Sequence, residues 1–458
     1  MKTAVAFICS LLITGFLYSQ QISKKLEDAV INLEADNQMK SAMISFYVIN
    51  ADGSVVFDKN SKTGLAVASS QKVITSAASL ELLGTNYRYK TELAYNGKIE
   101  NGTLNGNVYV IGYGDPTLGS WRYDNTKEQS VLNKWIRSLK SAGIRQVNGS
   151  VIGYDKNWES QTIPGGWIWD DIGNYYGAGT SGLNWHENQY DLILKPGNKE
   201  GEKVNILTAE PTLFGVTLTN ELTTGKPGSG DNGYIYLPPY STNGFVRGTV
   251  PPGKNNFTIS GSVPNPAAQL SAVFSKELLK QGIKVNQNDT DNNKEILPKV
   301  VTVSTLSSPP LDSINYWFLK KSINLYGEAL VKTLGYEKKK QGSTEAGLNI
   351  IKSFWQENGI DSTSINITDG SGLSPGNRVT AEALVKVMQY ARSKPWFKSF
   401  YNALPEINGI KMKSGSIGGV RSFTGYAGNY TFAIIINNYN GSSGEIVKKM
   451  YKLLDILK

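Results

Sequence analysis

The chain has 458 residues, a formal net charge of +9 and one cysteine, Cys9, which lies in an apolar N-terminal run. A mature chain without this run has no cysteine, which excludes disulfides, a cysteine nucleophile and a thiolate metal site. The sequence contains no Lys/Arg-rich block of the kind that would indicate nucleic-acid binding. We interpret the short basic clusters as solvated helix faces, and the basicity as a weak indication of an anionic envelope.

The first twenty residues have the layout of a secretory signal peptide. Lys2 precedes an apolar run from Ala4 to Leu17, and small or polar residues follow from Ser19 to Gln21. The run is too short to span a bilayer, and no later stretch approaches about 18 uncharged apolar residues. We therefore expect removal of residues 1–20, no transmembrane segment in the mature chain, and a periplasmic or cell-wall location.

The N-terminal part of the mature chain is predicted to form a helix, a hairpin and a second helix. In chain order these elements cover residues 22–35, 42–49 with 55–57, and 70–83. Apolar residues repeat at helical spacing in the helices, whereas β-branched and aromatic residues dominate the hairpin. From about residue 90 to 265, short apolar runs are broken by Gly, Asn and Pro, which predicts β-rich structure with exposed loops.

Helical periodicity returns in the C-terminal part. The expected elements are helices over residues 267–281, 316–334, 380–392 and 446–457 and strands over residues 422–427 and 431–436. Helical ends around a β-rich middle suggest an α/β (α+β) fold in which one domain is split by an insertion.

Histidine and calcium chemistry have little support in the sequence. His186 is the only histidine, and no catalytic or metal-binding pattern surrounds it. We interpret it as structural, and we expect no metal and no cofactor. The segment from Asp289 to Asn293 resembles the start of a calcium loop, but Lys294 stands where glycine is required, so we interpret this segment as a polar loop.

A serine activated by a neutral lysine is the remaining route to a strong nucleophile. Ala68-Ser-Ser-Gln-Lys72 offers this arrangement, because Ser69 begins a predicted helix and Lys72 follows three residues later on the same face. The helix N-terminus also directs positive potential toward Ser69, which favours an alkoxide or an oxyanion. Because Ser-x-x-Lys is common by chance, the prediction depends on further motifs.

The second motif is Ser322-Ile-Asn324. We expect Ser322 to relay a proton to the leaving amine, and the Asn324 amide to hold Lys72 and the substrate.

The third motif is Lys413-Ser-Gly-Ser416, at the start of a predicted edge strand. Lys413 adds charge, Ser414 adds a hydroxyl, and Gly415 lets an extended peptide approach the backbone. Such a peptide would add itself to the sheet edge, and the N–H groups of Ser69 and Ser416 would form the oxyanion hole.

The three motifs together are found in β-lactamases and penicillin-binding proteins. Beyond them, the sequence resembles the class C low-molecular-mass penicillin-binding proteins, the D-alanyl-D-alanine carboxypeptidase/endopeptidase family S13 of serine peptidases, over nearly the whole mature chain. The segments that carry this resemblance include Gly112–Leu118, Trp169–Gly177, Asp369–Ser374, Asn377–Thr380 and Gly425-Tyr426.

The resemblance implies a transpeptidase-like catalytic domain over residues 21–90 and 265–458. A β-rich insertion over residues 91–264, with two nested subdomains, would interrupt it. The implied activities are hydrolysis of D-Ala-D-Ala ends of peptidoglycan stem peptides and of D-Ala cross-links, together with acylation by β-lactam antibiotics.

Carried over by position, the resemblance implies that Ser69 is the nucleophile and Lys72 its general base. The residues implied to complete proton transfer and substrate binding are Ser322, Asn324 and Lys413.

Asp115 has two interpretations. The resemblance implies an acidic contact to the free amino group of the stem peptide's diamino acid, whereas turn chemistry alone predicts a cap before Pro116. Pro375 stands where relatives often carry arginine, which leaves the substrate preference open.

The alternative functions are a β-lactamase or esterase with the same Ser-Lys site and a non-catalytic wall-binding protein. The oligomeric state stays open.

Overall fold

The computed structural model describes residues 21–253, 255–286 and 296–458, and the chain forms two compact units. Unit 1 is made of Met1–Glu81, Asn315–Ser322 and Asn349–Lys458, and unit 2 of Leu82–Ile314 and Ile323–Leu348. The predicted signal peptide and the polar segment over residues 289–294 lie outside the described residues. Within the described ranges, no helix combines the length and the apolar character that crossing a membrane requires.

The predicted domain boundaries near residues 90 and 265 stay predictions. Residues 265–314, which the sequence assigns to the catalytic domain, cluster by their contacts with unit 2. Three helices each run across a boundary between the units, namely α2 (Lys72–Leu83), α6 (Leu311–Lys320) and α8 (Thr344–Glu357).

A six-stranded antiparallel sheet in the order β19-β20-β21-β22-β1-β2 forms the centre of unit 1. Its strands are β19 (Glu406–Ile407), β20 (Ile410–Ile417), β21 (Val420–Ala427), β22 (Tyr430–Asn437), β1 (Met43–Ile49) and β2 (Val55–Lys59). Tight hairpins with positive-φ glycines join β20 to β21 and β21 to β22, and hairpin geometry fixes strand register. This register places Lys413 opposite Thr424 and Gly415 opposite Ser422.

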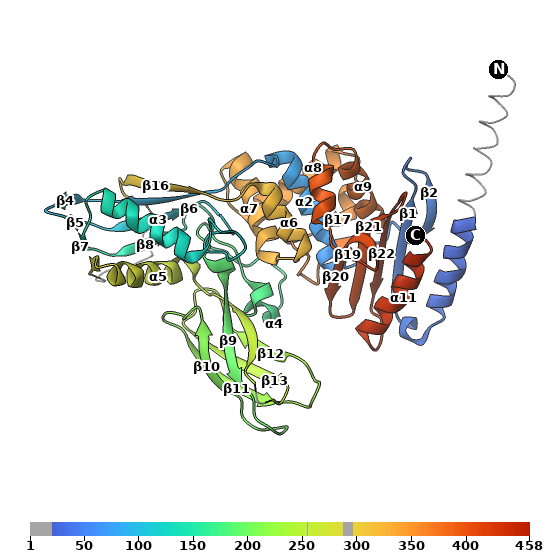
Figure 1. Ribbon diagram of the computed structural model, residues 1–458. Coiled ribbons are helices and arrows are strands. Elements are labelled where there is room, and N and C mark those ends of the chain that lie inside the picture. The colour runs from blue at the N-terminus through green and yellow to red at the C-terminus, as the bar shows by residue number, and fades with distance from the viewer. Residues whose placement is uncertain (1–20, 254, 287–295) are drawn as a thin grey trace, which may run out of the picture. The chain divides into compact units, whose positions relative to one another are not determined.

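Helices cover both faces of this sheet (Figure 1). The helix over residues 21–34 and α11 (Ser443–Asp455) share one face, where Leu26 and Met450 belong to the same apolar cluster as Ile434 of β22. On the other face, α9 (Ala381–Arg392) and the 3-10 turn η2 (Ala68–Gln71) contact the strands. The first predicted helix, the hairpin strands, α9 and α11 are therefore confirmed. The remaining elements of unit 1 are α10 (Phe397–Ala403), β17 (Ile365–Asn366) and β18 (Arg378–Val379).

The described part of unit 2 contains two large hydrophobic clusters on separate sets of strands, and a smaller one on β3, β6 and β8. The first cluster includes the sheets β16-β3-β6-β8 and β15-β7-β5-β4, whose strands are β3 (Lys90–Tyr95), β4 (Lys98–Glu100), β5 (Thr103–Asn105), β6 (Val108–Gly112), β7 (Gln146–Val147), β8 (Val151–Tyr154), β15 (Lys284–Val285) and β16 (Val301–Ser307). The second includes the sheets β10-β9-β14 and β11-β13-β12, with β9 (Gln189–Lys195), β10 (Asn205–Glu210), β11 (Thr217–Thr224), β12 (Asn232–Tyr236), β13 (Asn243–Val250) and β14 (Phe257–Ser262). The helices of unit 2 include α4 (Trp169–Ile172), α5 (Pro266–Lys280) and α7 (Asn324–Lys339).

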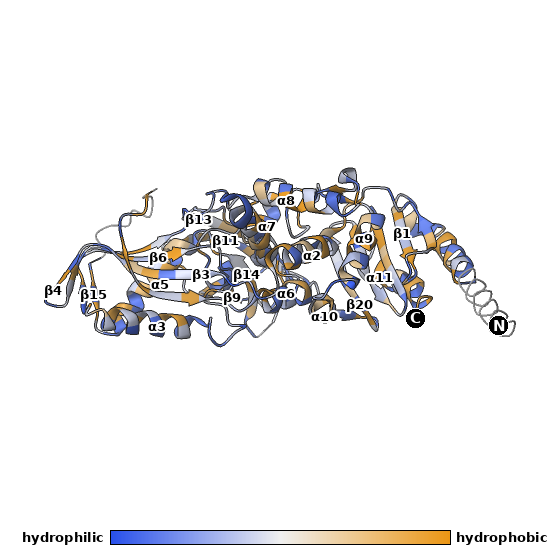
Figure 2. Cartoon of the chain, turned by 90° about the horizontal axis from the view of Figure 1, so that it is seen from above, coloured by the Kyte–Doolittle hydropathy of each residue, from blue (hydrophilic) through white to orange (hydrophobic). Residues whose placement is uncertain are grey.

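The structure corrects two sequence predictions. The region predicted as β-rich contains a long helix, α3 (Glu128–Ser141), whose buried residues Leu132, Trp135 and Leu139 lie at helical spacing. Figure 2 shows hydrophilic and hydrophobic segments alternating along α3, the pattern of a helix with one buried face. The single helical stretch predicted over residues 316–334 is instead two helices, because Ser322 adopts a left-handed conformation, with φ of 58°, between α6 and α7.

Candidate active site

Ser69 lies in the turn η2 and faces the lysine predicted to activate it. The α-helix starts at Lys72 rather than at Ser70, because η2 supplies the first turn. Lys72 Nζ donates a hydrogen bond of 2.9 Å to Ser69 Oγ. Ala68, directly before the nucleophile, has a φ of 46°, a conformation that costs a non-glycine residue roughly 1–3 kcal/mol. Strained residues of this kind cluster at functional sites.

Lys72 is fully buried, and its amine has a second partner in the loop between β17 and β18. Nζ donates to the backbone carbonyl of Ser371 at 2.7 Å. Two acceptors therefore fix the Lys72 amine beside the Ser69 hydroxyl. The amine is thus in position for proton transfer before a substrate arrives.

The loop that presents this carbonyl is organised by Asp369, a fully buried carboxylate. Its oxygens accept from the backbone N–H groups of Gly372 at 2.7 Å and Ser374 at 2.6 Å, and from Gln71 Nε2 at 3.1 Å. The carboxylate thus ties the Ser371 loop to the turn that carries the nucleophile. This segment carries part of the family resemblance, but the sequence alone predicts no role for Asp369.

The third motif packs directly against the nucleophile turn. A Cβ on Gly415 would lie 2.2 Å from the Val67 carbonyl oxygen and 2.9 Å from the Ser70 nitrogen, so no larger residue fits without a backbone shift. Ser70 Oγ donates to the Lys413 carbonyl at 3.2 Å. The buried Ser422 hydroxyl joins the two segments further, because it donates to the Val67 carbonyl at 2.6 Å.

Strand β20 offers an open edge at this point. Its first residues pair with the short strand β19, and Lys411 to Ile417 pair with β21 on the other side. In the part of the chain that the structure describes, no strand pairs with the outer edge from Lys413 to Ser416. The predicted edge strand is confirmed for these residues, and Ser416 is exposed there.

Lys413 is buried beside this edge, with 1% of its surface exposed, and its Nζ donates to the Ser414 carbonyl at 2.9 Å. Burial lowers the pKa of Lys413 to about 7. Near neutral pH the side chain is therefore poised between its charged and neutral forms.

The second motif spans the boundary between the units. Ser322 is half-buried at the end of the unit 1 segment, and Asn324 begins α7 in unit 2. Within unit 2, Asn324 Nδ2 donates to the Tyr176 carbonyl at 2.7 Å, so residues of the predicted insertion hold this amide.

A buried carboxylate that the sequence did not single out anchors the same turn of α7. Glu187 accepts the Tyr326 hydroxyl at 2.7 Å, the Ser120 hydroxyl at 2.6 Å and Arg122 Nε at 2.8 Å. A buried carboxylate is tolerated only when such donors and a cation satisfy it. Because Tyr326 lies in the first turn of α7, close to Asn324, this network fixes the start of the helix. Its four members lie too far apart in sequence to be recognised from spacing.

Asp115 forms the turn cap that its local sequence predicts. Its Oδ1 accepts from the Thr117 N–H at 2.8 Å and from Thr117 Oγ1 at 2.6 Å. Burial raises the pKa of Asp115 to about 6, against the lowering effect of these two bonds. The carboxylate also borders a cavity of about 430 Å³ that Lys134 and Arg137 help to line.

Asparagine at position 115 keeps an acceptor for Thr117 and removes the buried charge. Since the folded-state pKa of about 6 exceeds the usual 3.8, the native chain holds the extra proton in this window, and stability is lost as pH rises through it. We expect the difference in unfolding free energy between Asp115→Asn and wild type to rise by up to about 3 kcal/mol from pH 4 to pH 7. Urea unfolding at both pH values measures this, and a pH-independent difference would contradict it.

Comparisons with known proteins identify the family of the chain. The model of the D-Ala-D-Ala carboxypeptidase 3 (S13) family matches residues 26–456. A D-alanyl-D-alanine carboxypeptidase of Actinomadura sp. (strain R39) is 26% identical, over 92% of this chain and 82% of its own. D-alanyl-D-alanine carboxypeptidase DacB of Haemophilus influenzae is also 26% identical, over 86% of this chain and 85% of its own.

The fold has a counterpart among solved structures. Penicillin binding protein 4 of Haemophilus influenzae superposes with a TM-score of 0.76 at 23% identity, covering 91% of this chain and 96% of its own. The chain therefore belongs to the D-Ala-D-Ala carboxypeptidase S13 family and is a hydrolase of the serine DD-peptidase type.

Proposed function

We propose that Ser69 is the nucleophile of this DD-peptidase and forms an acyl-enzyme with the penultimate D-Ala of peptidoglycan stem peptides. The observation that carries the proposal is the 2.9 Å hydrogen bond between Lys72 Nζ and Ser69 Oγ, in a turn against which the open edge of β20 packs. The proposed proton acceptor Lys72, the proposed nucleophile Ser69 and a strand edge for an extended peptide thus occur together in unit 1.

The proposed proton transfers assign one role to each side chain. Neutral Lys72 takes the Ser69 proton as Oγ attacks the carbonyl carbon, and the N–H groups of Ser69 and Ser416 hold the oxyanion. Ser322 donates its hydroxyl proton to the leaving D-alanine nitrogen as the peptide bond breaks and takes the proton of Lys72 in return, so Lys72 is neutral again. Water then attacks the ester carbonyl carbon while Lys72 accepts a water proton. The bond to Ser69 Oγ breaks, Lys72 returns the proton to Oγ, and the shortened peptide is released.

The substrate backbone would add to the outer edge of β20 from Lys413 to Ser416, with which no strand pairs among the described residues. The proposal includes two more specific activities. One is endopeptidase cleavage of D-Ala cross-links, and the other is acylation by β-lactams outside the cytoplasm. Asp115 remains a proposed contact to the diamino acid's free amine, because its carboxylate borders a cavity as well as capping the turn.

Release of D-alanine from a peptide ending in D-Ala-D-Ala tests this proposal. We expect D-alanine to accumulate with the wild-type chain, and a cross-linked stem-peptide dimer to be split into monomers. Absence of both products would favour a non-catalytic wall-binding protein. Steady turnover of penicillin, in place of a long-lived adduct, would favour the β-lactamase alternative.

Lys413 makes the activity depend on pH through the substrate carboxylate. With a pKa of about 7, its amine is charged below neutral pH and loses its proton above it. We expect kcat/KM for a peptide with a free terminal carboxylate to fall as pH rises through about 7, because this ratio reports groups of the free enzyme. A peptide whose terminal carboxylate is an amide should lack this limb; identical profiles for the two substrates would remove Lys413 from carboxylate binding.

A further inference from the structure

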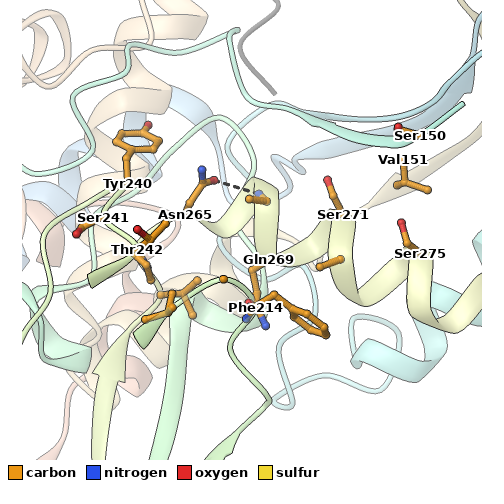
Figure 3. A pocket seen from close by; sticks show the side chains of 16 residues that line it. Ser150, Val151, Phe214, Tyr240, Ser241, Thr242, Asn265, Gln269, Ser271 and Ser275 are labelled. Atoms are coloured by element: carbon orange, nitrogen blue, oxygen red, sulfur yellow. Dashed lines mark hydrogen bonds between the residues drawn. The ribbon is translucent and has the colours of Figure 1, made fainter. Parts of the chain in front are cut away.

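A second cavity, of about 570 Å³, lies in unit 2 between α5, the start of β8 and two loops of the β9 to β14 region. Figure 3 shows Phe214, Tyr240 and Asn265 around it, with Ser271 and Ser275 projecting from α5. Its volume falls in the range of about 300–1,000 Å³ that is usual for small-ligand sites.

The chemistry of the lining selects a neutral ligand. Among the described residues, no charged side chain lines the cavity, whereas serine, threonine, asparagine and glutamine side chains alternate with valine, alanine and proline. A charged peptide would leave its carboxylates or ammonium groups unpaired against such a wall, which is costly. A ligand with many neutral hydroxyl or amide groups finds partners instead.

Two polar groups in the cavity have no hydrogen-bond partner among the described residues. The Ser275 hydroxyl lines the cavity although only 2% of the residue's surface is exposed. Asn265 caps α5 through Oδ1, which accepts from the Ala268 N–H at 3.0 Å, and this leaves its Nδ2 group as a donor. By contrast, Gln269 is occupied, since it binds the Phe214 N–H and the Thr212 carbonyl. The Ser275 hydroxyl and the Asn265 Nδ2 group are therefore available to a ligand.

Aromatic rings border the same cavity. Phe214 is half-buried, and Tyr240 is 43% exposed although its hydroxyl donates to the Ser160 carbonyl at 3.2 Å. Tyr240 also has a φ of 60°, an unfavourable conformation for an aromatic residue, which the surrounding loop must hold in place. Ring faces beside hydroxyl and amide groups complement a sugar, whose C–H face is apolar and whose edge carries hydroxyls.

We propose that this cavity binds an N-acetylated amino-sugar segment of a glycan strand. The Asn265 amide would donate to the acetamido carbonyl, the Ser275 hydroxyl would bond a sugar hydroxyl, and the aromatic rings would cover the apolar sugar face. The proposal rests on the proposed function, because stem peptides are attached to such glycans. The site would retain the enzyme on the polymer while its peptides are cut.

Calorimetric titration of the whole chain with chitotetraose, a neutral oligomer of N-acetylglucosamine, tests this site. We expect saturable binding, and at least tenfold weaker binding of cellotetraose, which lacks the acetamido groups. Asn265→Asp keeps the cap acceptor and removes the Nδ2 donor, so binding should weaken about tenfold while the melting temperature stays close to wild type. Ala272→Trp, which fills the cavity from α5, should abolish binding.

The same variants separate this site from the peptidase. D-Alanine release from a sugar-free peptide should stay at the wild-type rate in Asn265→Asp and Ala272→Trp, whereas release from glycan-linked stem peptides should fall. Failure of the wild type to bind chitotetraose, or equal affinity for cellotetraose, would overturn the sugar site and leave the proposed peptidase standing. Sugar binding without any D-alanine release would do the reverse.

Discussion

Labelled penicillin will modify the wild-type chain covalently and leave Ser69→Ala unmodified. The Ser69 hydroxyl is the one that Lys72 Nζ approaches to 2.9 Å, and alanine removes the attacking atom with little change in shape. Ser69 is only half-buried, so the substitution leaves no large cavity. Gel fluorescence or intact-protein mass detects the adduct.

Ser79→Ala is the matched control, because the same change is made in the helix that carries Lys72. The Ser79 hydroxyl is buried without a hydrogen-bond partner among the described residues, so its loss should be close to neutral. We expect full labelling of this variant. An adduct on Ser69→Ala at the wild-type rate would disprove the assignment of the nucleophile.

Lys72→Met will slow acylation by about 10²–10⁴, the range that a positioned general base supplies. Methionine fills most of the volume of the buried stem but cannot accept a proton, so loss of chemistry is separated from loss of packing. Stopped-flow acylation rates measure the effect, and near-UV circular dichroism reports whether the native packing is retained.

Lys72→Arg distinguishes a base from a charge. A guanidinium stays protonated at every working pH, so this variant keeps the positive charge and loses the acceptor. We expect it to be as slow as Lys72→Met. Near-wild-type acylation by Lys72→Arg would show that the charge alone suffices and would remove Lys72 from the role of base.

The local motifs of unit 1 could be predicted from the sequence. Ser69 and Lys72 meet because both lie within one turn, and Gly415 lies at a strand edge because its hairpin sets the register. Short-range geometry of this kind follows from spacing alone. Helix α3 was missed because glycine, asparagine and proline in the surrounding loops concealed its periodicity.

Long-range supports could not be predicted, because no spacing encodes them. Asp369 meets Gln71 across nearly three hundred residues, and Glu187 meets Tyr326 across 139. Each contact requires the tertiary fold, and a single sequence contains no sign of which distant carboxylate will be buried beside which donor. The left-handed Ser322 was missed for the same reason, since the residues on both sides of it have helical periodicity.

The Glu187 network links the start of α7 to residues 91–264, the predicted insertion, and this link constrains both protein engineering and sequence divergence. A minimal enzyme obtained by deleting residues 91–264 would lose Glu187, Arg122 and Ser120 together and leave the Tyr326 hydroxyl buried without its partner. The helix that begins at Asn324 would then lack its anchor at the turn nearest the motif. Chimeras that exchange insertions between relatives should therefore transfer Glu187 and Tyr326 as a pair, and the two residues should be inherited together.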